Sequence, residues 1–265
     1  MKVIENIIQV LYNTYRQSKM NIKMVIGEML NIEHLTKIYG DKTAVDDLSL
    51  KIEQGEIYGF IGHNGAGKTT TIKSCCGLLN FEQGNIFIDG ISIKENPLEC
   101  KRRLSYLPDN PDLYDFMTGI QYLNFIGDIY AMDTAFREEQ IHRYADMFEI
   151  TENLAQPLNS YSHGMKQKLA LISAFMHTPK LIMMDEPFVG LDPKASHLIK
   201  QEMRKMCDNG TAIFFSTHVL EVAEKLCDKI AIIQKGRLIV SGTTQEVRGN
   251  TSLEDVFLEL EDKNV

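Results

Sequence analysis

A glycine-rich loop between a strand pattern and a helix pattern constrains the fold more than any other feature of this chain. Residues 62–69 read GHNGAGKT and fit the pattern GxxxxGK[ST]. The mostly apolar residues 56–61 indicate a strand before the loop, and a helix is expected over residues 68–79 after it. Glycines let backbone N–H groups surround phosphate oxygens, and a helix N-terminus adds partial positive charge there. The segment therefore predicts a phosphate-binding loop in an α/β fold.

The side chains of the loop predict the ligand more narrowly. Lys68 would supply a full positive charge to the β- and γ-phosphates of ATP, and the Thr69 hydroxyl would be a ligand of Mg²⁺. A simple glycine turn, the alternative, leaves the flanking strand and helix patterns unexplained. The residues expected to bind the triphosphate are Gly62, His63, Asn64, Gly65, Ala66, Gly67, Lys68, Thr69 and Thr70.

Two further strand ends carry residues suited to chemistry on a phosphate. The apolar run 181–184 leads into Asp185 and Glu186, at the strand end where open α/β sheets bind ligands. Asp185 would hold Mg²⁺, through a water molecule. Glu186 is expected to point the other way along the pleat and to polarise an attacking water. His218 follows the strand at 212–216 and would contact the γ-phosphate or that water.

Strand and helix patterns alternate along most of the chain, which predicts a mostly parallel sheet with crossovers. Residues 110–178 are mainly helical and are expected to form an inserted lobe. Thr118 and Gln121 predict a capping box for one helix, and Ser252 and Asp255 cap the last one. The other expected strands are 31–35, 48–52, 85–90, 229–234 and 237–241, and the other expected helices are 137–148, 164–177, 194–208 and 252–261.

Composition excludes several classes of protein. A net charge of −8 and a pI near 5.4 argue against a nucleic-acid partner, which requires a basic face. The sequence has no run of about 18 apolar residues, as a membrane span would need, and no signal peptide is visible. Five cysteines without a CxxC pair indicate reduced thiols in the cytosol.

Residues 1–28 read differently from the rest and are expected to be an N-terminal amphipathic extension. Ile4, Ile7, Ile8, Leu11 and Tyr15 recur at helical spacing, and basic residues outnumber acidic ones in the extension. Such a segment would lie on a membrane surface or dock on a partner. The alternative interpretation, that residues 1–28 are a non-essential extension ahead of the main domain, remains open.

From about Leu30 to Glu261, the chain resembles the nucleotide-binding subunit of an ABC transporter. The order of several short motifs carries the resemblance. They are Tyr39 at the adenine-stacking position, 62–70 at the Walker A loop, 106–109 at the Q-loop, 161–165 at the signature, 181–186 at the Walker B strand, 190–192 at the D-loop and His218 at the switch histidine.

The resemblance implies an α/β fold: a P-loop NTPase core with a mostly parallel sheet, an antiparallel β subdomain and an inserted α-helical subdomain, all within residues 29–265. It implies an ATPase that uses ATP and Mg²⁺ and pairs head to tail with a second ATP-binding subunit, expected to be a copy of itself. Ser162 and Gly164 would then bind the γ-phosphate held by the other subunit, and Asp192 would contact nucleotide. Catalysis would fall to Glu186, His218 and Lys68.

The resemblance also implies a partner and a place in the cell. A separate transmembrane permease subunit would hold this one at the inner face of the cell membrane, on the cytoplasmic side. Nucleotide prefers the closed pair, so ATP binding and hydrolysis would drive that partner.

Two positions depart from the family pattern. Asp109 stands where the Q-loop normally has glutamine; it would bind ATP and Mg²⁺ as a shorter, negatively charged ligand. The signature reads YSHGM instead of LSGGQ, which keeps Ser162 and Gly164 but places His163 between them. Both departures resemble a branch of exporters for drugs and antimicrobial peptides.

Two other functions remain open from the sequence. A soluble ABC ATPase acting in assembly, translation or repair would share the motifs, but such proteins typically carry two cassettes or a long insertion. An unrelated P-loop kinase or GTPase would not explain Ser162, Gly164 and His218 in this order.

Overall fold

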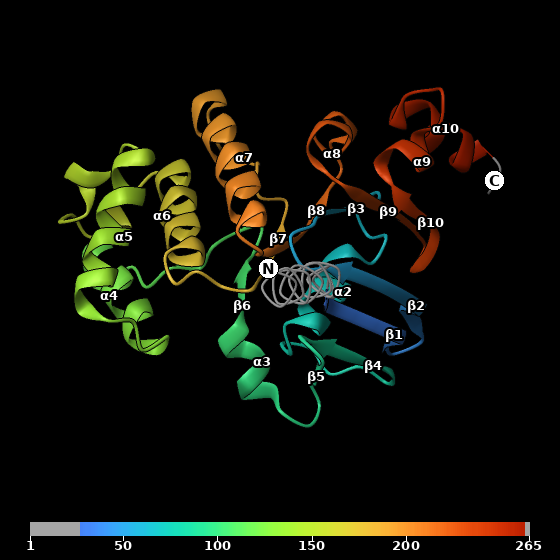
Figure 1. The fold of residues 1–265 in the computed structure, drawn as a ribbon, viewed down its shortest axis with the longest axis horizontal. Coiled ribbons are helices and arrows are strands. Elements are labelled where there is room, and N and C mark those ends of the chain that lie inside the picture. Colours follow the sequence, from blue (N-terminus) through green and yellow to red (C-terminus); the bar gives the residue numbers. More distant parts are fainter. Residues whose placement is uncertain (1–26, 263–265) are drawn as a thin grey trace, which may run out of the picture.

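The computed structural model describes residues 27–262, which form two sheets and a set of helices (Figure 1). The smaller sheet is antiparallel, with strand order β2-β1-β4-β5. It confirms the expected antiparallel β subdomain. Its strands are β1 (Glu28–Tyr39), β2 (Lys42–Glu53), β4 (Gln83–Ile88) and β5 (Ile91–Ser92).

The larger sheet has the order β10-β9-β3-β8-β7-β6 and is parallel except at β10, which runs antiparallel to β9. This confirms the mostly parallel sheet. Its strands are β3 (Ile57–Ile61), β6 (Leu104–Leu107), β7 (Leu181–Asp185), β8 (Ala212–Thr217), β9 (Lys229–Gln234) and β10 (Arg237–Thr243).

An α-helical lobe is inserted between β6 and β7, which are neighbours in the large sheet. Its helices α4, α5 and α6 gather at one end of the molecule, away from the antiparallel sheet (Figure 1). The lobe helices are α4 (Gly119–Ile129), α5 (Thr134–Met147) and α6 (His163–Phe175), with short 3-10 turns at Thr151–Asn153 and Leu158–Ser160. The remaining helices are α2 (Lys68–Cys75), α3 (Pro97–Arg103), α7 (Pro193–Asp208), α8 (Leu220–Leu226), α9 (Thr244–Arg248) and α10 (Leu253–Asp262).

The large sheet is buried on both faces, and alternate residues of its central strands serve different cores. In β3, Ile57 and Ile61 belong to a core shared with the lobe and with α7, whereas Tyr58 and Phe60 belong to a core shared with α2 and the antiparallel sheet. Strands β7 and β8 alternate in the same way. Because successive strand side chains point to opposite faces, an uninterrupted apolar strand can supply two cores.

The helix after the phosphate loop is shorter than predicted: it ends at Cys75, not near residue 79. Gly77 has φ +64°, a conformation that glycine adopts without strain. The Leu78 N–H donates to the carbonyl of Lys73, and the Gly77 N–H donates to that of Ser74. These two bonds form a Schellman motif, which satisfies the last carbonyls and stops the helix.

The predicted helix caps are confirmed. Thr118 and Gln121 form a reciprocal capping box at the start of α4. The Asp255 N–H donates to Ser252 Oγ, and the Ser252 N–H donates to the Asp255 carboxylate, ahead of α10. The amphipathic pattern in residues 1–28, by contrast, lies outside the described residues apart from 27 and 28. None of the helices within 27–262 combines the length and apolar character that a membrane span requires.

Candidate functional site

A cavity of about 300 Å³ lies at the carboxyl ends of β3 and β7, beside the start of α2. It gathers most of the residues that the sequence predicted. Ligands bind at this edge of parallel sheets because helix N-termini and strand-end loops converge there. The lining residues are Tyr39, Lys42, Ala44, His63, Asn64, Gly65, Gly67, Lys68, Thr69, Thr70, Asp109, Asp185 and Glu186.

The phosphate loop depends on glycine at defined positions. Gly67 has φ +112° directly before α2, and a Cβ there would lie 2.6 Å from the carbonyl oxygen of Ala44. Gly65 has φ +80° and open space where a side chain would be. Any other residue would strain the loop or fill the space that a phosphate needs. The backbone around Gly65 is therefore free to approach an anion.

Lys68 lies folded against its own loop. Its Nζ donates to the carbonyl oxygens of Gly62 at 2.6 Å and His63 at 3.2 Å, and it lies 3.7 Å from Glu186 Oε1. Only 5% of the residue is exposed. Burial lowers the pKa of Lys68, and the nearby carboxylates of Glu186 and Asp185 oppose that shift. A buried cation on a phosphate loop suits a polyanionic ligand.

Thr69 and Asp185 form the second contact of the site. Thr69 Oγ1 donates to Asp185 Oδ2 at 2.5 Å, and the Ser216 hydroxyl donates to the other oxygen of Asp185. Asp185 is buried at the end of β7. Hydroxyl and carboxylate oxygens are the hard ligands that Mg²⁺ prefers, so the residues present fit the ion. Ser216 was not predicted from the sequence, although it lies in β8, the strand that leads to the predicted His218.

Glu186 does not continue the pleat of β7, and the expectation that it points away from Asp185 was wrong. Its φ is +49°, so the backbone turns and both carboxylates line one cavity. The Glu186 N–H donates to Ser216 Oγ at 3.1 Å. Glu186 Oε1 lies 3.0 Å from Nδ1 of His218, yet among the described residues it has no partner with hydrogen-bond geometry. A buried carboxylate oxygen without such a partner can accept a proton from water.

Asp109 and Tyr39 lie at the wall of the cavity. Asp109 follows β6 and is exposed, and Tyr39 ends β1 with 46% of its surface exposed. Lys37 Nζ lies 5.0 Å from the centre of the Tyr39 ring. Lys42, which the sequence analysis did not single out, also lines the cavity. An exposed ring at the entrance is available for stacking on a nucleotide base.

Ser162, Gly164 and Asp192 do not line the cavity. Ser162 is the N-cap of α6 and accepts from the Met165 N–H, and Asp192 is the N-cap of α7 and accepts from the Ala195 N–H. That backbone bond, with Lys168 Nζ at 3.2 Å, lowers the pKa of Asp192.

The starts of α6 and α7 nevertheless lie together. The closest atom to a Cβ built on Gly164 is the Gly190 carbonyl oxygen, at 3.2 Å. A Cβ on Gly190 would lie 2.6 Å from Cδ2 of His163. The predicted signature and D-loop residues therefore form a second patch, separate from the cavity.

Comparison with known proteins places the chain in a family. Residues 45–189 match the family model described as ABC transporter. The chain belongs to the ATP-binding proteins of ABC transporters. It is 36% identical over 80% of its length to the ABC transporter ATP-binding protein YhcH of Bacillus subtilis, covering 68% of that protein. It is 33% identical over 83% of its length to the linearmycin resistance ATP-binding protein LnrL of the same organism, covering 70% of it.

A solved structure of the ATP-binding subunit of an ABC transporter has the same fold. Its TM-score is 0.85 at 33% identity, and the match covers 88% of this chain and 99% of the other. As an ABC ATPase, the chain has the antiparallel sheet, the parallel-rich sheet and the inserted helices expected from its sequence.

Proposed function

We propose that this ABC ATPase binds ATP with Mg²⁺ in the cavity and hydrolyses it to power separate membrane subunits, in the direction of export. The convergence of Lys68, the Thr69–Asp185 pair and the Glu186 carboxylate in one cavity carries the proposal. The relatives are named as transporter proteins, so a soluble ABC ATPase acting in assembly, translation or repair is not favoured.

Each residue has a distinct task. The loop N–H groups and Lys68 bind the β- and γ-phosphates, and Tyr39 stacks on the base. Mg²⁺, held by Thr69 and Asp185 with Asp109 nearby, would neutralise phosphate charge. Glu186 takes a proton from the attacking water at Oε1, and His218, 3.0 Å from that oxygen, orients the carboxylate.

A second copy of the chain completes the site. Ser162 and Gly164 lie at the start of α6, where backbone N–H groups and the helix dipole favour an anion. Because this patch lies apart from the cavity, the γ-phosphate that it binds is the one held by the other copy. Asp192 lies at the same patch and contacts nucleotide across the pair. ATP then stabilises the closed pair, and hydrolysis releases it.

An apolar groove supports docking of a membrane subunit. It has a volume of about 430 Å³ and lies between the sheet core and the lobe. Leu78, Leu98 and Ile129 at the groove are each more than half exposed. Exposed apolar clusters of this kind mark interaction sites. A permease docked here would hold the chain at the cytoplasmic face of the membrane, and the resistance relative favours export as the direction.

The Glu186→Gln variant tests the proposal. The amide keeps the shape of the side chain but cannot take a proton, so ATP turnover should fall by roughly 10²–10⁴-fold. ATP binding should remain, and an ATP-bound dimer should accumulate. Steady-state phosphate release and size-exclusion chromatography with light scattering measure the two effects.

The matched control is Glu221→Gln, because Glu221 is exposed on α8 and pairs there with Lys225. It should hydrolyse ATP at the wild-type rate and remain monomeric after turnover. Wild-type turnover in Glu186→Gln would remove Glu186 as the base, and an inactive variant that never dimerises would argue against closure of a pair.

A further inference from the structure

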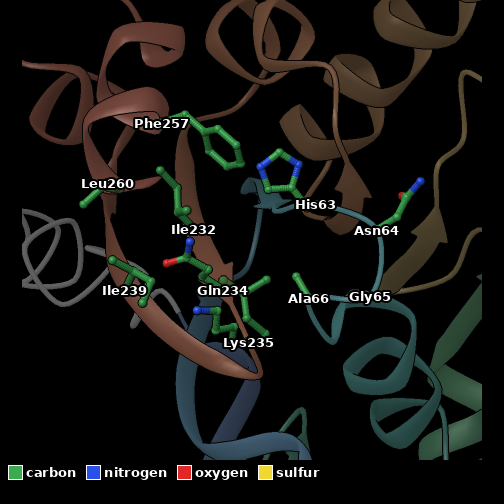
Figure 2. Close-up of a pocket in the computed structure, with 11 residues that line it drawn as sticks. His63, Asn64, Gly65, Ala66, Ile232, Gln234, Lys235, Ile239, Phe257 and Leu260 are labelled. Atoms are coloured by element: carbon green, nitrogen blue, oxygen red, sulfur yellow. The ribbon is translucent and has the colours of Figure 1, made fainter. Parts of the chain in front are cut away.

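A second cavity, of about 290 Å³, lies between the phosphate loop, the β9–β10 hairpin and α10 (Figure 2). Its wall combines three parts of the chain that are distant in sequence: the loop, the β9–β10 hairpin and α10. The proposed ATPase cycle assigns it no role. The lining residues are His63, Asn64, Gly65, Ala66, Ile232, Ile233, Gln234, Lys235, Ile239, Phe257 and Leu260.

The inner wall of this cavity is apolar. Ile232, Ile239, Phe257 and Leu260 lie on one side of it (Figure 2). The Phe257 ring meets the His63 ring edge to face, with centroids 4.8 Å apart. Ile239 is 37% exposed. Covering apolar surface of this kind removes it from water, which favours an apolar occupant.

Helix α10, which contributes Phe257 and Leu260 to the wall, is acidic, and Lys235 of the hairpin is the charged residue in the lining itself. Residues 253–262 read LEDVFLELED and contain five acidic residues and no basic one. Phe257 and Leu260 turn toward the cavity, and Glu254 and Asp255 lie in the first turn of the same helix. An occupant that has one apolar face and a neighbouring basic face would match both the apolar wall and the acidic helix α10.

We propose that this cavity binds the apolar stripe of residues 1–26 of the same chain. Ile4, Ile7, Ile8, Leu11 and Tyr15 fall within one face at helical spacing. The same 26 residues contain four basic residues and one acidic residue. Their apolar stripe matches the wall, and their net positive charge matches the acidic α10.

The residues that connect the apolar stripe to β1 are long enough to reach the cavity. The Gln54 N–H donates to the Gly27 carbonyl at one end of β2, and the Asp46 N–H donates to Gly236, beside the cavity, near the other end. The strand steps from Asp46 to Gln54 span roughly 26 Å. Residues between Tyr15 and Gly27 extend up to about 40 Å. The segment can therefore reach the cavity within one chain.

Docking of this segment would restrict the phosphate loop on the side that faces the β9–β10 hairpin. The Gly236 N–H donates to the carbonyl of Ala66 at 2.9 Å, and His63 and Ala66 belong to both the loop and the cavity wall. Filling the cavity restricts movement of this side of the loop, which the nucleotide contacts from the other side.

Disulfide trapping in the full chain tests the inference. The five native cysteines are all buried, so cysteines introduced at Ile8 and Ile239 are the reactive pair. We expect an intramolecular disulfide that forms at least tenfold faster than in Ile8→Cys with Phe136→Cys. Phe136 has the same 37% exposure as Ile239 but lies on α5 of the lobe.

Equal rates for the two pairs would overturn the inference, and so would disulfides that join only separate chains, since those indicate docking on a second copy. Hydrogen exchange of the full chain gives an independent reading. Residues 4–15 should exchange at least tenfold faster in Ile239→Lys than in wild type or Phe136→Lys. Fast exchange already in wild type would show an empty cavity. None of these readings depends on ATP hydrolysis, so the proposed function stands or falls separately.

Discussion

At the scale of single residues, one hydroxyl positions both acidic side chains of the site. Ser216 donates to the Asp185 carboxylate and accepts from the Glu186 N–H. It thereby fixes the Asp185 carboxylate, which would hold Mg²⁺, and the start of the turn that brings Glu186 into the cavity. Pre-positioned groups of this kind lower the cost of reaching the reactive geometry.

Asp109 is the residue whose role departs most from the family pattern. It is exposed at the cavity wall and can approach Mg²⁺ or its water shell only from the end of β6. We expect Asp109→Ala to leave ATP binding nearly intact and to lower hydrolysis roughly tenfold, the smaller effect typical of outer metal partners. ATP titration and phosphate release, in the complex with its membrane partner, measure both quantities.

Asp109→Gln is the rescuing variant, because the longer amide supplies an oxygen of the usual type. Asn110→Ala, at the neighbouring exposed position, is the control that should change nothing. Full hydrolysis and full coupling to transport in Asp109→Ala would leave Asp109 an ordinary loop residue.

At the scale of elements, a stacked pair of rings joins the end of α6 to the end of α4. Tyr130 and His177 lie with centroids 3.6 Å apart and planes 9° from parallel, and Tyr130 Oη donates to the Leu104 carbonyl in β6. His177 Nε2 is buried with no hydrogen-bond partner among the described residues. The stack therefore ties the lobe to the large sheet through a neutral imidazole.

This stack predicts acid sensitivity. Burial lowers the pKa of His177 from 6.5 to about 4. The unfolded chain therefore binds the proton first, and stability is lost as the pH falls from about 6.5 toward 4. At pH 5 the loss is about 2 kcal/mol relative to pH 7. His177→Phe keeps the stacked rings but removes the group that binds the proton. Its free energy of unfolding should therefore fall by about 2 kcal/mol less than that of wild type between pH 7 and pH 5, as measured by urea unfolding at both pH values.

The matched control is His142→Phe, because His142 is exposed on α5 near Asp146. The Tyr130–His177 stack is intact in this variant, so its loss of stability between pH 7 and pH 5 should exceed that of His177→Phe. The same pH dependence in His177→Phe and wild type would show that His177 does not titrate in this window.

Element existence was predictable where a single local pattern decides it. The central strands of the large sheet are continuous apolar runs, the lobe helices are 11 to 14 residues long, and the capping pairs lie within four residues of each other. Helices α3, α8 and α9 were missed because each has seven residues or fewer and is held by tertiary contacts. The full lengths of β1 and β2 were missed as well, since the register shifts of their hairpin break the alternation.

The site was predictable by residue but not by geometry. Lys68, Thr69, Asp185 and Glu186 follow from the loop and from one strand end. The shared direction of the two carboxylates depends on the positive φ of Glu186, which a pleat argument cannot supply. Ser216 lies in β8 and contacts residues at the end of β7, so no local sequence pattern predicts its role.

At the scale of the whole molecule, the groove between lobe and core predicts which surface holds the membrane subunit. Leu98→Glu places a charge on a residue that is 64% exposed, so the fold and the ATPase of the isolated chain should not change. Co-purification with a polytopic membrane protein should fall at least tenfold, because a charge at the centre of an apolar contact is costly. Affinity capture from solubilised membranes measures this.

Leu258→Glu, on α10 and 54% exposed, is the control and should retain the partner. Undiminished capture with Leu98→Glu would place the docking surface elsewhere on the chain.

The double-sided sheet has a consequence for how the molecule melts. Strands β3, β7 and β8 place neighbouring side chains in opposite cores. Separating one core from the sheet would therefore expose the strands that also support the other core. Neither layer can loosen alone at low cost, which favours a single cooperative transition. A scanning calorimeter should record one heat-absorption peak for lobe, sheet and antiparallel layer together, although the chain has the outline of several parts.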